Sequence, residues 1–279
     1  MIVGMADLPP YLSPSSATAF DGCPRRWMFK YVERRLEPSG QAAIVGSFVH
    51  EVLEALCRLP APARTQDRAK ELARALWPSV EENDDYLSLA LSEEEARAFR
   101  WQAWLAVTGL WRLEDPADVD VLSTEQKVTA ELAGVPFLGI IDRVDRVGGR
   151  LVITDYKSGA VPAARWRADK MQQVLLYAAA FEQLDGQQPD RARLLYLGQR
   201  VLEVTVTSPK IEAAASQLAA TWKGIETACA SDRFDAKPSV LCGWCPFAND
   251  CPEGRAELVK REAAGTLPSH APARLLALA

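Results

Sequence analysis

Hydrophobic positions recur at helical spacing over the first 118 residues, and the pattern then changes to the alternation of strands. The helical spacing predicts helices over 17–35, 46–59, 66–77 and 92–113. The later pattern predicts strands over 119–131, 135–147, 150–156, 191–197 and 200–206, and helices over 169–184 and 209–231. This order of elements indicates a mixed α/β core with helices appended to it.

Two of the predicted strands meet at Gly148-Gly149, a pair typical of a two-residue hairpin turn with positive φ. If the turn is centred there, opposed residues have numbers that sum to 297, which places Asp142 opposite Asp155. Because side chains alternate between the faces of a strand, Lys157 shares the face of Asp155, and Asp145 points the other way. A bulge would shift the register and separate the two acids.

Two carboxylates facing each other destabilise a hairpin unless a cation compensates their charge. Apolar residues flank this pair on the same face, which disfavours a surface hairpin with solvated charges. We therefore interpret Asp142, Asp155 and Lys157 as a site for metal-assisted hydrolysis of phosphodiesters. The flanking residues are Leu138, Ile140, Val144, Leu151 and Ile153.

The charge balance excludes a uniformly basic nucleic-acid binder, since the 279 residues carry a formal net charge of −5. A local basic groove remains compatible with this value, because an acidic run at 81–95 masks basic charge elsewhere. The basic clusters at 25–35 and 165–170 offer candidate phosphate contacts. These are Arg25, Arg26 and Arg165, whereas Arg143 is favoured least because it lies on the hairpin face opposite Asp142.

The N-terminal residues lack the basic flank and the apolar stretch of a signal peptide. No segment approaches the ~20 apolar residues of a membrane span. We therefore expect a cytoplasmic protein that does not engage a membrane and whose six cysteines do not form disulfides.

Three cysteines within ten residues, Cys242, Cys245 and Cys251, indicate a metal site in such a protein. Cys23 is the best candidate for a fourth ligand, because Cys57 and Cys229 lie in helices and are expected to be buried small residues. Zinc sites and iron–sulfur clusters both use four thiolates. The spacing alone leaves both alternatives open, together with a chance grouping of cysteines that binds no metal.

Taken together and in this order, the motifs resemble the RecB-like branch of the PD-(D/E)xK nucleases. The similarity is greatest to its iron–sulfur members, related to the CRISPR-associated RecB-like exonucleases and the AddB nuclease domain. Ile141 stands where the superfamily nominally has proline, which is unexceptional in this branch. The motifs are Ser13-Pro-Ser-Ser with Cys23-Pro-Arg-Arg, Gly46-Ser-Phe-Val-His50, Gly139-Ile-Ile-Asp142-Arg, Asp155-Tyr-Lys157, Gln173-Val-Leu-Leu-Tyr177 and the three clustered cysteines.

The resemblance implies an α/β, restriction-endonuclease-like core in a single nuclease domain over 1–279. Its parts would be N-terminal helices over 1–118, a nuclease core over 119–232 and an iron–sulfur segment over 233–255 that closes on Cys23. It further implies that Cys23, Cys242, Cys245 and Cys251 hold a 4Fe–4S cluster.

The resemblance also implies roles at the metal centre. Mg²⁺ or Mn²⁺ would be bound by His50, Asp142, Asp155 and the backbone carbonyl of Tyr156, with the imidazole favouring manganese. Lys157 would orient the attacking water or stabilise negative charge. Gln173 and Tyr177 share a helix face and would position the lysine or the DNA strand.

We therefore expect a metal-dependent DNA exonuclease, acting on single-stranded ends in DNA repair, recombination or CRISPR adaptation. Its partners would be a helicase or CRISPR or recombination proteins. One alternative is a catalytically silent DNA-binding or assembly module of the same fold, which has no need of Asp142, Asp155 and Lys157 together. Another is a zinc-stabilised protein of unrelated function.

Overall fold

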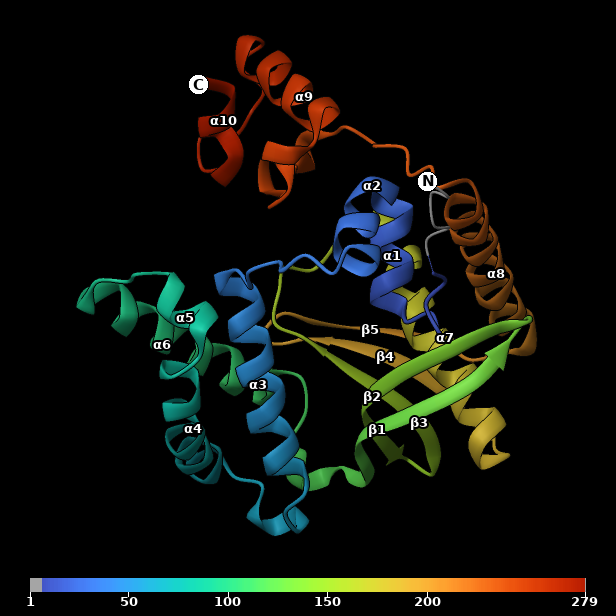
Figure 1. The fold of residues 1–279 in the computed structure, drawn as a ribbon. Helices are drawn as coiled ribbons and strands as arrows, with labels where there is room; N and C mark the ends of the chain where they lie inside the picture. The colour runs from blue at the N-terminus through green and yellow to red at the C-terminus, as the bar shows by residue number, and fades with distance from the viewer. Residues whose placement is uncertain (1–6, 279) are drawn as a thin grey trace. The chain divides into compact units, whose positions relative to one another are not determined.

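A computed structural model describes residues 7–278, and the chain divides into two compact units (Figure 1). The first unit combines Met1–Pro38 with Gln217–Ala279, and the second comprises Ser39–Ser216. The boundary falls within helix α8 (Ser208–Ser231). The single nuclease domain expected from the sequence stays a prediction.

The second unit is built on a five-stranded mixed sheet in the order β1-β2-β3-β4-β5. All neighbouring strands are antiparallel except β3 and β4, which run parallel and are joined through helix α7 (Arg167–Asp185). A parallel pair needs such a crossover, and α7 packs across the sheet. Each strand lies within one residue of its predicted range: β1 (Asp120–Leu132), β2 (Val135–Val147), β3 (Arg150–Lys157), β4 (Arg191–Tyr196) and β5 (Arg200–Thr205).

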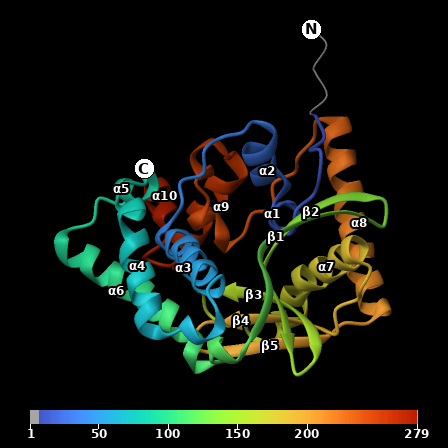
Figure 2. The same ribbon diagram turned by 90° about the horizontal axis from the view of Figure 1, so that it is seen from below.

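A group of helices lies beside the sheet in the same unit, as Figure 2 shows from below. They share one apolar core, in which the rings of Phe48 and Trp77 meet edge to face with centroids 5.0 Å apart. The short α5, which Asn83 caps, lies within the acidic run at 81–95. The helices are α3 (Gln41–Cys57), α4 (Gln66–Glu81), α5 (Asp84–Ser88) and α6 (Glu93–Thr108).

The first unit contains the N-terminal and C-terminal helices, and here one prediction was wrong. The single helix expected over 17–35 is divided at Cys23 into α1 (Pro14–Gly22) and α2 (Pro24–Trp27), followed by a π-helical turn over Met28–Val32. The residue before a proline avoids helical angles, and Cys23 is extended, with φ −164°. The unit also contains α9 (Pro252–Ala263) and α10 (Leu275–Leu278). No helix among residues 7–278 is long and apolar enough to cross a membrane.

The predicted hairpin register is confirmed. Gly148 and Gly149 have φ values of 56° and 77°, as the two-residue turn requires. Val144 pairs with Ile153, and Arg143 with Thr154, so the paired numbers sum to 297. The ladder ends at that last pair, one position before Asp142 and Asp155, and β3 continues by pairing with β4. The two strands therefore part at the two acids, and the expected pair of Asp142 directly opposite Asp155 does not form.

Arg143 belongs to a buried ion network on the other face of the hairpin, which corrects its candidacy as a phosphate contact. Its side chain is fully buried, with Nε 2.6 Å from Oδ1 of Asp145, and it also pairs with Glu114. Its Nη1 donates a hydrogen bond of 2.8 Å to the hydroxyl of Tyr156. Arg193 approaches the second oxygen of Asp145 at 2.9 Å. Through its hydrogen bond from Arg143, this network holds the side chain of Tyr156, the residue between Asp155 and Lys157.

Replacing Arg143 with alanine leaves Asp145 and Glu114 with one fewer cationic partner in a buried setting. We expect Arg143→Ala to lower the free energy of unfolding by about 3–5 kcal/mol, measured by urea denaturation. Arg146→Ala is the control, since Arg146 is exposed on the same strand, and its effect should stay within about 0.5 kcal/mol. Equal stability of the two variants would contradict the assigned role of the network.

Candidate active site

Asp142 lies where β2 and β3 separate. Its side chain takes the place of a backbone acceptor of the β2–β3 ladder. Its carboxylate Oδ2 accepts a hydrogen bond of 2.7 Å from the backbone N–H of Tyr156. The side chain is 8% exposed, so this carboxylate is held in a nearly dry setting. The predicted Asp142 is thus both a structural acceptor and a candidate ligand.

His50 reaches the same point from helix α3. Its Nε2 lies 3.1 Å from the carbonyl oxygen of Tyr156, and its Nδ1 lies 3.4 Å from Oδ2 of Asp142. Burial opposes protonation of the ring, but the hydrogen bond and negative charge of Asp142 outweigh it and raise the pKa of His50. The structure therefore brings together three of the predicted ligand groups: the imidazole, the Asp142 carboxylate and the Tyr156 carbonyl.

Glu125 is a candidate ligand that the sequence interpretation missed. Among the residues that the structure describes, ligand atoms of His50, Glu125 and Asp142 lie within 4.8 Å of one another, and no other set of three or more acidic, histidine or cysteine residues does so. In the β1–β2 register, Glu125 falls opposite Asp142, between the pairs Thr124–Arg143 and Gln126–Ile141. Alternation counted from the first hairpin turn, as from Gly148 in the second, places Glu125 opposite Asp142, so the sequence contains the signal for this residue.

The backbone of Glu125 is strained, since its φ of 46° lies in the left-handed region. A non-glycine residue in that region costs about 1–2 kcal/mol. Such strain is found at ligand-binding and catalytic positions, where the surrounding structure enforces it. Burial and the nearby charge of Asp142 raise the pKa of Glu125 to about 7.

Asp155 and Lys157 form the second half of the site, on β3. Asp155 is 2% exposed, and its Oδ2 lies 2.6 Å from Nζ of Lys157. Burial and the charge of Asp142 raise the pKa of Asp155 to about 6. Asp155 lies outside the tight His50, Glu125 and Asp142 group, so its predicted role as a ligand stays a proposal.

Gln173 and Tyr177 complete the site from helix α7, as their spacing predicted. Nε2 of Gln173 donates to Oδ1 of Asp155 and to the Tyr177 hydroxyl, each over 2.9 Å, and its Oε1 accepts from Lys157 over 3.2 Å. Burial, followed by the charge of Asp155, raises the pKa of Tyr177 above its usual range. A Cβ at Gly139 would lie 2.6 Å from the Tyr177 ring, so only glycine lets this helix approach β2.

The space beside these residues is open and acidic. A cavity of ≈ 480 Å³ is lined by residues of α3 and by Glu125. Three of its six lining residues are glutamates, Glu51, Glu54 and Glu125, and no lysine or arginine lines it. Oxygen ligands and one imidazole are a donor set that fits a divalent cation such as Mn²⁺ or Mg²⁺.

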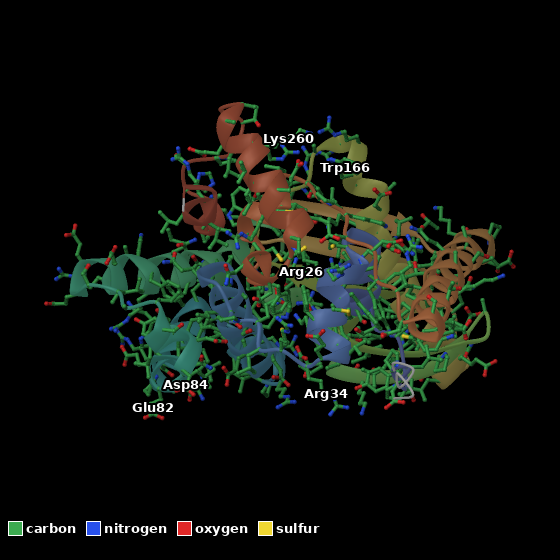
Figure 3. All side chains as sticks on the ribbon, turned by 45° about the horizontal axis from the view of Figure 1, so that its top comes forward. Arg26, Arg34, Glu82, Asp84, Trp166 and Lys260 are labelled. Atoms are coloured by element: carbon green, nitrogen blue, oxygen red, sulfur yellow. The ribbon has the colours of Figure 1, made fainter. Side chains whose placement is uncertain are left out.

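The predicted DNA-contacting arginines differ in their surroundings. Arg165 and its neighbour Trp166 are exposed at the start of α7, where Trp166 projects outward (Figure 3). Arg25 donates a hydrogen bond of 2.7 Å to the carbonyl of Phe234, and Arg26 pairs with Glu37. Arg25 and Arg26 therefore have partners within the first unit, and Arg165 is the most accessible of the three.

The four predicted cluster ligands line one cavity in the first unit, together with Arg25 and Arg26: Cys23, Cys242, Cys245 and Cys251. Backbone N–H groups of Lys237, Ser239 and Gly254 point at the sulfurs of Cys23, Cys242 and Cys251, at 3.4, 3.4 and 3.3 Å. Burial raises the pKa values of Cys245 and Cys251. The two remaining cysteines, Cys57 and Cys229, are buried and do not line this cavity.

The chain is similar in sequence to a known nuclease superfamily. The sequence model of the PD-(D/E)XK nuclease superfamily matches residues 11–252. A solved structure from Eubacterium rectale, described as a "Putative exonuclease", superposes with a TM-score of 0.55 at 16% identity, covering 84% of this chain and 86% of that one. A second, SSO0001, has 16% identity, covers 76% of this chain and 95% of its own, and has a TM-score of only 0.33. No curated protein matches the chain.

The raised pKa of Glu125 makes metal-free stability depend on pH. Its folded pKa of about 7 exceeds the usual 4.5, so the folded protein holds this proton more tightly, and the resulting stability is lost as pH rises through about 7. We expect Glu125→Gln to raise the unfolding free energy at pH 8 by roughly 1 kcal/mol, with little change at pH 5.

The measurement is urea denaturation in EDTA at both pH values. Glu131→Gln, an exposed change on the same strand, is the control and should have the same effect at both. A Glu125→Gln effect that does not depend on pH would contradict the assigned environment of this carboxyl.

Proposed function

The chain belongs to the PD-(D/E)XK nuclease superfamily, and on that premise we propose that it is a metal-dependent DNA exonuclease acting on single-stranded ends. The observation that carries the proposal is the convergence of His50, Glu125 and Asp142 beside the Asp155–Lys157 ion pair. The description of the Eubacterium rectale structure favours an exonuclease. Repair, recombination or CRISPR adaptation is the proposed setting, with a helicase or CRISPR or recombination proteins as partners.

The acidic side chains and His50 are the proposed ligands of Mn²⁺ or Mg²⁺, together with the carbonyl of Tyr156. When bound, the cation polarises the scissile phosphate and lowers the pKa of a coordinated water. Asp142 is held for this role by the Tyr156 N–H, which fixes the direction of its carboxylate. The imidazole in the donor set favours manganese over magnesium.

Lys157 is the proposed electrostatic stabiliser of the reacting phosphate. Its ammonium is held between Oδ2 of Asp155 at 2.6 Å and Oε1 of Gln173 at 3.2 Å, so it is oriented before substrate arrives. A fixed cation beside developing negative charge lowers the barrier without reorganisation. Gln173 also donates to Oδ1 of Asp155, so one side chain positions both members of this ion pair.

Removing either member of the ion pair should abolish most of the activity. We expect Asp155→Asn and Lys157→Ala each to lower the rate of Mn²⁺-dependent nucleotide release from single-stranded DNA by at least about 100-fold. The matched controls are Asp120→Asn and Lys127→Ala, exposed changes on β1 that should retain the rate. If all four variants cleave as the parent does, the mechanism is rejected and the activity lies elsewhere.

We also propose that the four cysteines of the first unit hold a 4Fe–4S cluster rather than zinc. Tetrahedral zinc with sulfur at about 2.3 Å would bring thiols to roughly 3.8 Å of one another. No three of the described cysteine sulfurs lie within 4.8 Å of one another, which favours a larger group. N–H groups directed at three of the sulfurs, and the two arginines of the cavity, suit thiolates carrying an anionic cluster.

The proposed cluster makes the first unit depend on its cysteines. We expect purified protein to be brown, with absorbance near ~400 nm and bound iron and sulfide. Cys245→Ala should be colourless and poorly soluble, whereas Cys229→Ala, a change at a buried cysteine outside the cavity, should keep the colour. Zinc without iron in the parent protein, or a soluble and fully active Cys245→Ala, would contradict the proposal.

A further inference from the structure

A second cavity, of ≈ 540 Å³, lies among helices α3, α4 and α6 of the second unit. Phe48 lines it from α3, while His50, two residues further along the same helix, lines the acidic cavity of the active site. At 3.6 residues per turn, these two side chains leave α3 on nearly opposite sides. The cavity is therefore separated from the active site by the thickness of one helix.

The charges on these helices are segregated toward the cavity. Helices α4, α5 and α6 carry five basic residues, and four of them line it: Lys70, Arg74, Arg97 and Arg100. The same helices carry eight acidic residues, of which only Glu81 lines it. Asp84, one of the others, projects outward into solvent, as does the neighbouring Glu82 (Figure 3). A basic cavity on an otherwise acidic group of helices suits an anionic occupant.

The interior of the cavity is aromatic. Trp77 is fixed there by Phe48, by Arg100 stacked 5.1 Å over its ring, and by a hydrogen bond of 2.8 Å from its Nε1 to Glu81. Trp101, by contrast, is 60% exposed and leaves an indole face open beside the cations. Within residues 7–278, Lys70 and Arg74 form no ion pair, so both remain available to a ligand.

We propose that this cavity binds single-stranded DNA outside the active site, with a base stacked on Trp101 and the adjoining phosphates held by Lys70, Arg74 and Arg97. An open aromatic face flanked by cations is the combination that binds single strands without sequence preference. A duplex keeps its bases stacked inside and offers no such face. The inference rests on the proposed function, since it assigns to the same DNA substrate a second point of attachment.

Binding of a fluorescent 20-nucleotide oligothymidine to the full chain, measured by anisotropy in EDTA, tests this without cleavage. We expect Trp101→Leu to raise Kd at least about fivefold. Arg74→Ala and Arg97→Ala should each reduce the slope of log Kd against log salt concentration by about 0.7. Arg68→Ala is the matched control, because Arg68 is the one basic residue of these helices that does not line the cavity, and it should leave both quantities unchanged.

Unchanged binding in Trp101→Leu and in the double variant Arg74→Ala/Arg97→Ala would overturn the inference. Tighter binding of an acidic helical peptide than of oligothymidine, lost in the same variants, would also overturn it and assign the cavity to a protein partner. Cleavage by the parent in Mn²⁺ separates the two proposals. If the parent cleaves DNA and the variants bind oligothymidine as tightly as the parent, only the DNA-binding role of the cavity is rejected. If the parent does not cleave DNA but binds it through the cavity, only the proposed catalysis is rejected.

Discussion

The hydrogen bond from the N–H of Tyr156 to the carboxylate of Asp142 is the contact on which the site depends. It takes the place of a backbone hydrogen bond between the strands, so β2 can separate from β3 while the buried N–H of Tyr156 keeps an acceptor. As a result, Asp142 and Asp155 do not face each other across the hairpin. The same bond brings the carbonyl of Tyr156 next to His50. One side-chain acceptor thus converts the end of a hairpin into a place where ligands from β1, β2 and α3 converge.

The opposite face of the hairpin holds this arrangement in place. Arg143 and Arg193 both form ion pairs with Asp145 in the core, and Arg143 also donates a hydrogen bond to the hydroxyl of Tyr156. The backbone of Tyr156 therefore presents its N–H to Asp142 while its side chain is anchored beneath the sheet. Alternation along β3 then places Asp155 and Lys157 together on the face of the candidate site, where Gln173 holds both. The buried ion network on one face of β3 therefore determines where Asp155 and Lys157 lie on the other face.

The sequence allowed the strands, the hairpin register and the grouping of Asp155 with Lys157 to be predicted, because alternation and a Gly-Gly turn depend only on neighbouring residues. Glu125 was not predicted, because the register counted from Gly148 relates only β2 to β3, and Glu125 lies on β1. The break at Cys23 was missed because a helical hydrophobic pattern continued across Pro24. The cavity beside Trp101 could not be predicted, since it arises from the packing of three helices whose spacing no local pattern determines.

We infer that His50, Glu125 and Asp142 bind the cation that the chemistry requires. Anomalous diffraction at the manganese edge, from crystals soaked in Mn²⁺, can locate this cation. We expect a manganese peak at bonding distance, about 2.0–2.3 Å, from the Asp142 carboxylate and the His50 ring, and loss of that peak in Asp142→Asn. A peak bound only by other residues, in protein that still cleaves DNA, would contradict it.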